Sequence, residues 1–90
     1  MTIPDLVESE ELLSMSADTD GKTFRVAIRP EDTATRLMQA REKGQELPLV
    51  VLTTDAGMIA LDSVYVADVV VGGQPPVAEV TFNAQAVRFV

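Results

Sequence analysis

The last fourteen residues of the chain, 77–90, alternate between apolar and polar side chains over most of their length. Apolar residues recur at positions 80, 82, 84 and 86, and polar ones lie between them, a period of two that indicates a β-strand with one buried face. Fourteen residues at about 3.3 Å each would extend up to about 46 Å. A chain of 90 residues forms a domain with a radius of gyration of only about 12 Å. The strand must therefore bend around the domain or project from it.

Four further segments read as strands. Residues 11–17 and 23–29 alternate on either side of an Asp-Thr-Asp-Gly turn and predict a β-hairpin, with a helix over residues 5–16 as the competing prediction. Residues 47–54 predict a buried strand, and residues 58–71 a long strand whose apolar positions change parity near Asp62 and Ser63. A bulge or bend at that point would account for the change. The Gly-Gly-Gln-Pro-Pro run at 72–76 predicts a loop.

One segment, residues 29–44, has the features of an α-helix. Pro30 precedes an acidic first turn, and basic residues near the other end match the helix dipole. Gly44 suits the position just after a helix. The apolar stripe of this helix consists of Ala34, Leu37 and Met38. Because the stripe is narrow, the helix is expected to cover one side of a sheet.

Together these segments predict a mainly β, α+β fold. The expected architecture is a small antiparallel β-barrel or sandwich of about five strands with one helix packed on it, in which the third to fifth strands form a meander. Residues 1–11 contain Pro4 and a run of acids, so they are predicted to be a flexible or docking N-terminal arm with little to bury. Residues 12–90 form the single β-rich domain.

The residue inventory argues against catalysis. The chain has no cysteine and no histidine, which removes disulfides, thiolate ligands and the commonest general base. The Asp-Thr-Asp-Gly turn lacks the spacing and the closing glutamate of a calcium loop. We therefore expect no enzyme activity, no catalytic, cofactor-binding or metal-binding residues, no cofactor and no small-molecule substrate. No apolar run is long enough to span a bilayer and no signal peptide is visible, so a cytoplasmic protein without membrane contact is expected.

Charge is unevenly distributed along the chain, which carries a net charge of −7. This excess of acids disfavours nucleic acid as the main partner. Residues 1–21 contain six acids and no base, whereas residues 22–43 contain six bases and three acids. Such segregation favours contacts between protein subunits. The predicted interface comprises an acidic set, a basic set and the apolar end of the last strand: Asp5, Glu8, Glu10 and Glu11; Arg25, Arg29, Arg36 and Arg41; and Val87, Phe89 and Val90.

Residues 47–90 resemble the closing strands of small β-barrel proteins from phage tails, a lineage of tail-tube and baseplate-hub proteins related to the tube protein of type VI secretion. The resemblance lies in a Gly-Gly-x-Pro loop followed by a strand of the pattern apolar–Thr–apolar–Asn–x–x–x–apolar, and in the turn at 53–57. The matching residues are Gly72, Gly73, Pro75, Val80, Thr81, Phe82, Asn83 and Val87. It implies a structural role, assembly into rings, and no cofactor.

We therefore expect a non-catalytic structural component of a phage tail or baseplate, located in the virion after synthesis in the host cytoplasm. Its partners would be other protein subunits, in a homo-oligomeric ring and among neighbouring tail proteins. The alternative is a small acidic inhibitor or adaptor, of phage or bacterial origin, that binds a basic groove on a host protein. The acidic N-terminal residues and the sequence pI of about 4.3 motivate that alternative.

Overall fold

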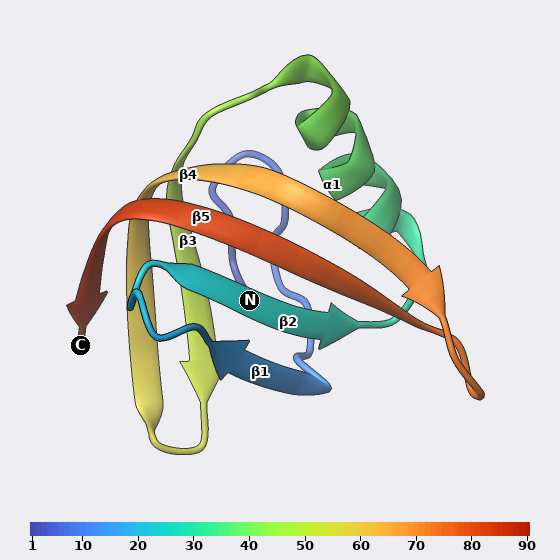
Figure 1. Cartoon of the computed structure of the whole chain (residues 1–90), viewed down its shortest axis with the longest axis horizontal. Coiled ribbons are helices and arrows are strands. Elements are labelled where there is room, and N and C mark those ends of the chain that lie inside the picture. The colour runs from blue at the N-terminus through green and yellow to red at the C-terminus, as the bar shows by residue number, and fades with distance from the viewer.

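The computed structural model describes all 90 residues as one five-stranded sheet with one helix (Figure 1). Along the sheet the strands follow the order β1-β2-β5-β4-β3, and every neighbouring pair is antiparallel. The elements are β1 (Ser14–Ala17), β2 (Thr23–Ile28), α1 (Asp32–Lys43), β3 (Leu47–Thr54), β4 (Gly57–Gly72) and β5 (Val77–Phe89). This confirms the predicted fold class, the first hairpin and the β3–β5 meander. The competing helix over residues 5–16 is absent, since β1 begins at Ser14.

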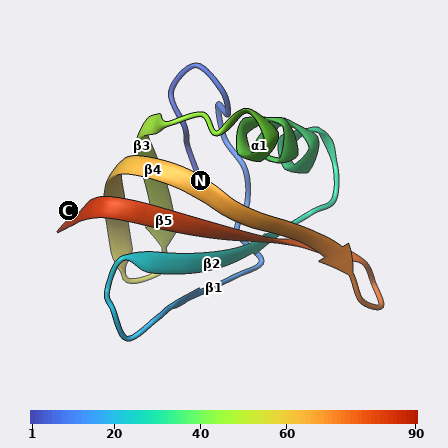
Figure 2. The same ribbon diagram turned by 45° about the horizontal axis from the view of Figure 1, so that its top comes forward.

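The buried face of the sheet follows from the period of two. Phe24 and Val26 of β2 lie opposite Phe82 and Val80 of β5, and all four side chains are buried. The sheet is strongly curved, and its two edge strands approach each other without hydrogen bonding (Figures 1 and 2). Residues of the β1 edge and of the β3–β4 turn line one hollow of about 400 Å³. The fold is therefore a curled sheet around one core rather than a closed barrel.

Strand β4 changes its buried face at Ser63, as the parity of its apolar residues predicts. Leu61 and Val64 are both fully buried although they lie three positions apart. Ser63 lies between them and has a φ of 51°, in the left-handed region. This conformation reverses the alternation of side chains, so that even-numbered residues face the core after it and Leu61 does so before it. A second irregularity shifts the register between Val66 and Asp68. These two irregularities accompany the bending of the long β4–β5 ribbon around the core.

Helix α1 packs on β4 and closes one end of the curled sheet. It buries Ala34, Leu37 and Ala40, while Met38, which the sequence places in the apolar stripe, is only half-buried. The helix begins at Asp32, and Glu31 at its N-terminal boundary makes no side-chain capping bond. At the other end Gly44 has a φ of 60°. The Gly44 and Gln45 N–H groups donate to the carbonyls of Arg41 and Ala40, which satisfies the end of the helix.

Replacing Gly44 by alanine is expected to lower the free energy of unfolding by about 1 kcal/mol, because a residue with a Cβ pays for the left-handed conformation. No atom lies within 4 Å of the added Cβ, so the cost comes from the backbone alone. Thermal unfolding followed by circular dichroism should show a melting temperature lower by about 4–8 °C. Gly72→Ala is the matched control, because Gly72 lacks a positive φ and its Cβ would also meet open space. Equal melting temperatures for the two variants would contradict this account.

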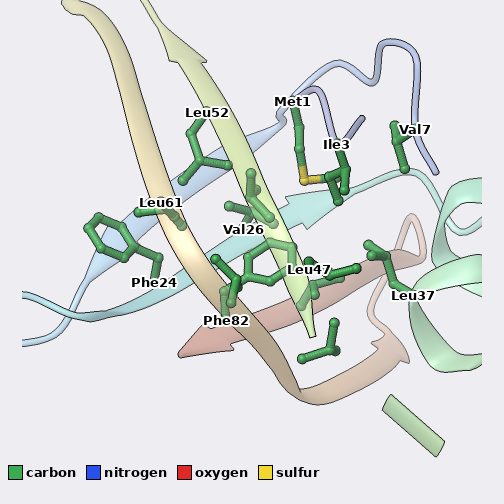
Figure 3. Packing of buried hydrophobic residues seen from close by; sticks show 14 of the residues in the cluster. Met1, Ile3, Val7, Phe24, Val26, Leu37, Leu47, Leu52, Leu61 and Phe82 are labelled. Carbon is green, nitrogen blue, oxygen red and sulfur yellow. The ribbon is translucent and has the colours of Figure 1, made fainter. Parts of the chain in front are cut away.

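Residues 1–10 differ from the sequence-based expectation of an arm with little to bury. Met1, Ile3 and Val7 are each no more than 5% exposed and join the single hydrophobic core of the domain (Figure 3). Thr2 adds to the free edge of β3 through two hydrogen bonds with Val51. The expectation of little burial is wrong because the three apolar residues, although scattered among acids, meet the open side of the core beside β3. Docking of this segment on another protein stays a prediction.

Candidate assembly surfaces

The interior of the domain is apolar. Its 20 buried residues are all apolar, and no buried side-chain polar atom lacks a hydrogen-bond partner. No group of three or more acidic side chains gathers where a metal ion could be held. Asp55 lies in the β3–β4 turn, and Asp68 is exposed on β4. The charged side chains are therefore all at the surface.

The predicted basic residues are all exposed or half-buried, and each contacts its own chain. Arg25 pairs with Asp18, Arg29 Nη2 lies 3.3 Å from Glu11 Oε1, and Arg41 Nη2 lies 3.8 Å from Asp68 Oδ1. Arg36 donates to the Leu6 carbonyl oxygen at 2.9 Å. Since at least two fifths of each paired side chain is exposed, solvent screens these ion pairs and each contributes little to stability. Pairs this weak can be exchanged for contacts with another protein.

The predicted acidic residues divide into two groups. Glu11 forms the predicted acid–base contact with Arg29, but within one chain. Asp5, Glu8 and Glu10 form no ion pair, and all three lie in the N-terminal segment. The predicted contacts between copies therefore stay a prediction, and of the four predicted acids these three have no arginine partner within the chain.

The strongest ion pair of the surface was not predicted. Arg88 of β5 donates from Nε to Asp62 Oδ2 at 2.7 Å and from Nη2 to Asp62 Oδ1 at 2.9 Å. Two parallel bonds of this kind are the favoured geometry of arginine and carboxylate. The register of β4 on β5 places Ala60 opposite Arg88 and Asp62 opposite Ala86, so the pair is a diagonal cross-strand contact. No local sequence signal reveals it, since the two residues are 26 positions apart.

The hydrogen bonds from Arg88 lower the pKa of the Asp62 carboxyl. A carboxyl with a lower pKa in the folded than in the unfolded state stabilises the fold above its unfolded pKa of about 3.9 and loses that contribution as the pH falls through the folded pKa. In Arg88→Gln the pKa of Asp62 is expected to rise to its ordinary range, as measured by NMR titration. Asp20 is the internal control: the backbone N–H of Lys22, then the Thr23 hydroxyl and N–H, lower its pKa independently of Arg88. An unchanged Asp62 titration would refute the assignment.

Exposed apolar side chains gather at the two ends of the β4–β5 ribbon. At the hairpin end, Val70 and Val71 are 55% and 46% exposed. At the other end, Phe89 and Val90 are 80% and 74% exposed, and the neighbouring Met58 is 44% exposed. Figure 1 shows the two ends on opposite sides of the molecule. We call them the hairpin patch (Val70 and Val71) and the terminal patch (Met58, Phe89 and Val90).

The three predicted apolar interface residues therefore have different surroundings. Val87 is half-buried and packs against the core, so it completes the domain interior. Phe89 lies directly opposite Ile59 of β4, and the Val90 N–H donates to the Met58 carbonyl at 3.0 Å. Strand β5 thus bends around the core and also presents its apolar end to solvent. The hairpin patch was missed, because a run of valines is typical of a buried strand and the sequence does not show that β3 pairs with β4 only as far as Val64.

The chain contains no helix with the length and apolar character needed to cross a bilayer.

Comparison with known proteins finds a match in fold alone. No protein family and no curated protein matches the sequence. Among solved structures, the crystal structure of Hcp2 from Salmonella typhimurium is similar, with a TM-score of 0.74. The similarity covers 88% of this chain and 67% of the Hcp2 chain, at 15% sequence identity. The chain shares the fold of Hcp2 over nearly its whole length.

Proposed function

We propose that the chain is a non-catalytic structural subunit that assembles with further copies of itself into a tube-like ring. The fold shared with Hcp2 is the observation that carries the proposal, because Hcp2 is a structural tube protein of type VI secretion. The sequence resemblance to tail-tube and baseplate-hub proteins points to the same lineage. We propose further that the protein belongs to a phage tail, a baseplate or a related contractile machine, and that its final location is the virion.

The surface of the domain supports this role. Apolar side chains are exposed at both ends of one ribbon, outside the core, and contact with another protein would remove them from water. The two patches are different, so one copy's hairpin patch would meet the terminal patch of the next. Contacts of this heterologous kind close into a ring when the rotation between copies permits it. A 90-residue domain without disulfides also gains stability when such patches are covered.

The experiment is a measurement of mass and shape. Native mass spectrometry and multi-angle light scattering of the purified protein should show a defined multiple of the 9.7 kDa chain, and negative-stain electron microscopy should show rings. The same measurements would be repeated after addition of the proteins that neighbouring genes encode. A strictly monomeric chain at high concentration, with and without those proteins, would refute the proposal.

The alternative function, an acidic inhibitor or adaptor, has one observation in its favour. Asp5, Glu8 and Glu10 lie in one short segment without an arginine partner, so a basic groove on another protein could bind them. Charge reversal at Glu8 and Glu10 would abolish binding to such a host protein, whereas a ring held mainly by the two apolar patches would still form, because exposed ion pairs between copies contribute little to association. Charge reversal at these two positions, followed by measurement of both host-protein binding and ring formation, therefore separates the two functions.

A further inference from the structure

The N-terminal segment, residues 1–10, forms a small hairpin of its own. Ile3 and Val7 exchange two backbone hydrogen bonds, from Ile3 N to Val7 O at 2.9 Å and from Val7 N to Ile3 O at 2.8 Å. Glu10 N donates to the Met1 carbonyl at 2.9 Å, and the Met1 α-amino group donates to the Glu10 carbonyl at 2.6 Å. These bonds lie within the segment, so the hairpin would keep them wherever it binds.

Few polar contacts connect this hairpin to the rest of the domain. Thr2 and Val51 exchange two backbone bonds, at 2.9 and 2.8 Å, along the free edge of β3. Arg36 adds the single bond to the Leu6 carbonyl. Apolar side chains provide the remaining attachment: Leu6 packs half-buried against the core, and Figure 3 shows the buried side chains of Met1, Ile3 and Val7 against it. A free strand edge and an apolar depression beside it thus form the binding site of the hairpin.

The connection between the hairpin and β1 can act as a hinge. Glu11 and Leu12 make no backbone–backbone hydrogen bond, whereas Glu10 before them and Leu13 after them do. The only side-chain contact of polar type there is the Glu11–Arg29 pair, in which both side chains are more than half exposed. A change of backbone direction at Glu11 and Leu12 would break this pair and the packing of the half-buried Leu12 side chain against the core, and no other contact of these two residues.

The outer half of the hairpin is packed loosely. A hollow of about 540 Å³ lies between residues 2–8 and Arg36 of the helix. Asp5 at the tip has a φ of 66°, a conformation that costs free energy in any residue other than glycine. The hairpin is therefore held by its three buried side chains and one strand bridge, and not by a close fit to the helix.

We propose that residues 1–10 exchange between copies of this chain, so that the hairpin of one copy binds the β3 edge and apolar depression of its neighbour. The hairpin fits the site on a neighbouring copy, because that site is identical to the one that the hairpin fills in its own chain. All contacts inside and beneath the hairpin are the same in both states, and only the Glu11–Leu12 hinge differs, as in domain swapping generally. Proximity of copies in an assembly favours the exchanged form through a high effective concentration. In that respect the inference rests on the proposed function.

Cysteine chemistry tests the exchange cleanly, because the chain contains no cysteine. Two single variants, Thr2→Cys and Val51→Cys, are mixed, assembled and oxidised, and covalent dimers are measured on a non-reducing gel. A disulfide between positions 2 and 51 in this mixture joins two different chains, so exchange is expected to raise the heterodimer severalfold above background. The background comes from Thr2→Cys mixed with Asn83→Cys, whose cysteine is exposed on the outer face of β5.

The double variant Thr2→Cys/Val51→Cys extends the test. Exchange around a ring predicts a ladder of linked chains, whereas a hairpin that stays on its own chain gives only an internal disulfide at the mass of one chain. Thr23→Cys/Asn83→Cys is the matched control: these side chains touch across β2 and β5, at 3.2 Å between their oxygens, and should link only within one chain. If substitution at Val51 prevents folding, isotope-filtered NMR of mixed wild-type samples replaces it, with contacts between Thr2 and Val51 of different chains as the readout.

The outcomes separate this inference from the proposed function. Assembly with background levels of the heterodimer overturns exchange and leaves the structural role in place. Exchange that stops at dimers supports the inference and counts against the ring. A monomer with only internal disulfides overturns both.

Discussion

Replacing Phe82 by alanine is expected to lower the free energy of unfolding by about 3–5 kcal/mol. Phe82 is fully buried in the middle of β5, with Phe24 of β2 opposite it on one side and Val66 of β4 on the other. The substitution removes the ring and leaves a cavity where three strands meet. Small domains have about 5–15 kcal/mol of stability in total, so this loss would remove a large share of it. Urea unfolding followed by circular dichroism should show a lower midpoint with an unchanged slope.

Phe89→Ala is the matched control for that prediction. It is the same substitution, seven positions further along the same strand, in a side chain that is 80% exposed. The free energy of unfolding should change by no more than about 0.5 kcal/mol when measured on dilute protein, below the concentration at which copies associate. Similar losses in the two variants would mean that the core is not centred on β5.

The alternation of apolar residues was sufficient to predict most of the sheet, because a strand with one buried face repeats its pattern every second residue. It also located the change of face in β4, which Ser63 produces by its positive φ. The helix ends at Gly44 as predicted, since the left-handed conformation there is a local requirement. Each of these features depends on residues close together in the sequence.

The features that escaped prediction depend on contacts distant in the sequence. The burial of Met1, Ile3 and Val7 requires the free edge of β3, which forms some 45 residues later along the chain. The Asp62–Arg88 pair requires the register of two long strands. The exposure of Val70 and Val71 follows from the fact that β3 pairs with β4 only as far as Val64, so the rest of β4 has no neighbouring strand on that side. Most of the candidate surfaces likewise depend on contacts between residues that are distant in the sequence.

Aspartate in either apolar patch is expected to abolish assembly while the domain stays folded. Val70→Asp places a charge in the hairpin patch and Phe89→Asp places one in the terminal patch, both at exposed positions. An apolar residue at the centre of an interface contributes about 2–4 kcal/mol, so association should weaken by a factor of about 30–1,000. Multi-angle light scattering should report single chains for each variant. Gln85→Asp, on the exposed outer face between the ends of β5, adds the same charge and should assemble normally.

Mixing the two variants tests how the patches meet. If the hairpin patch of one copy binds the terminal patch of the next, Val70→Asp retains an intact terminal patch and Phe89→Asp an intact hairpin patch. The mixture can then form one native junction, which gives a heterodimer that cannot grow because both of its outer ends carry aspartate. If each patch instead binds its own kind, as in a two-fold dimer, every variant alone would still pair through its intact patch. Single chains from each variant and dimers only from the mixture would establish a head-to-tail contact; dimers from either variant alone would exclude it.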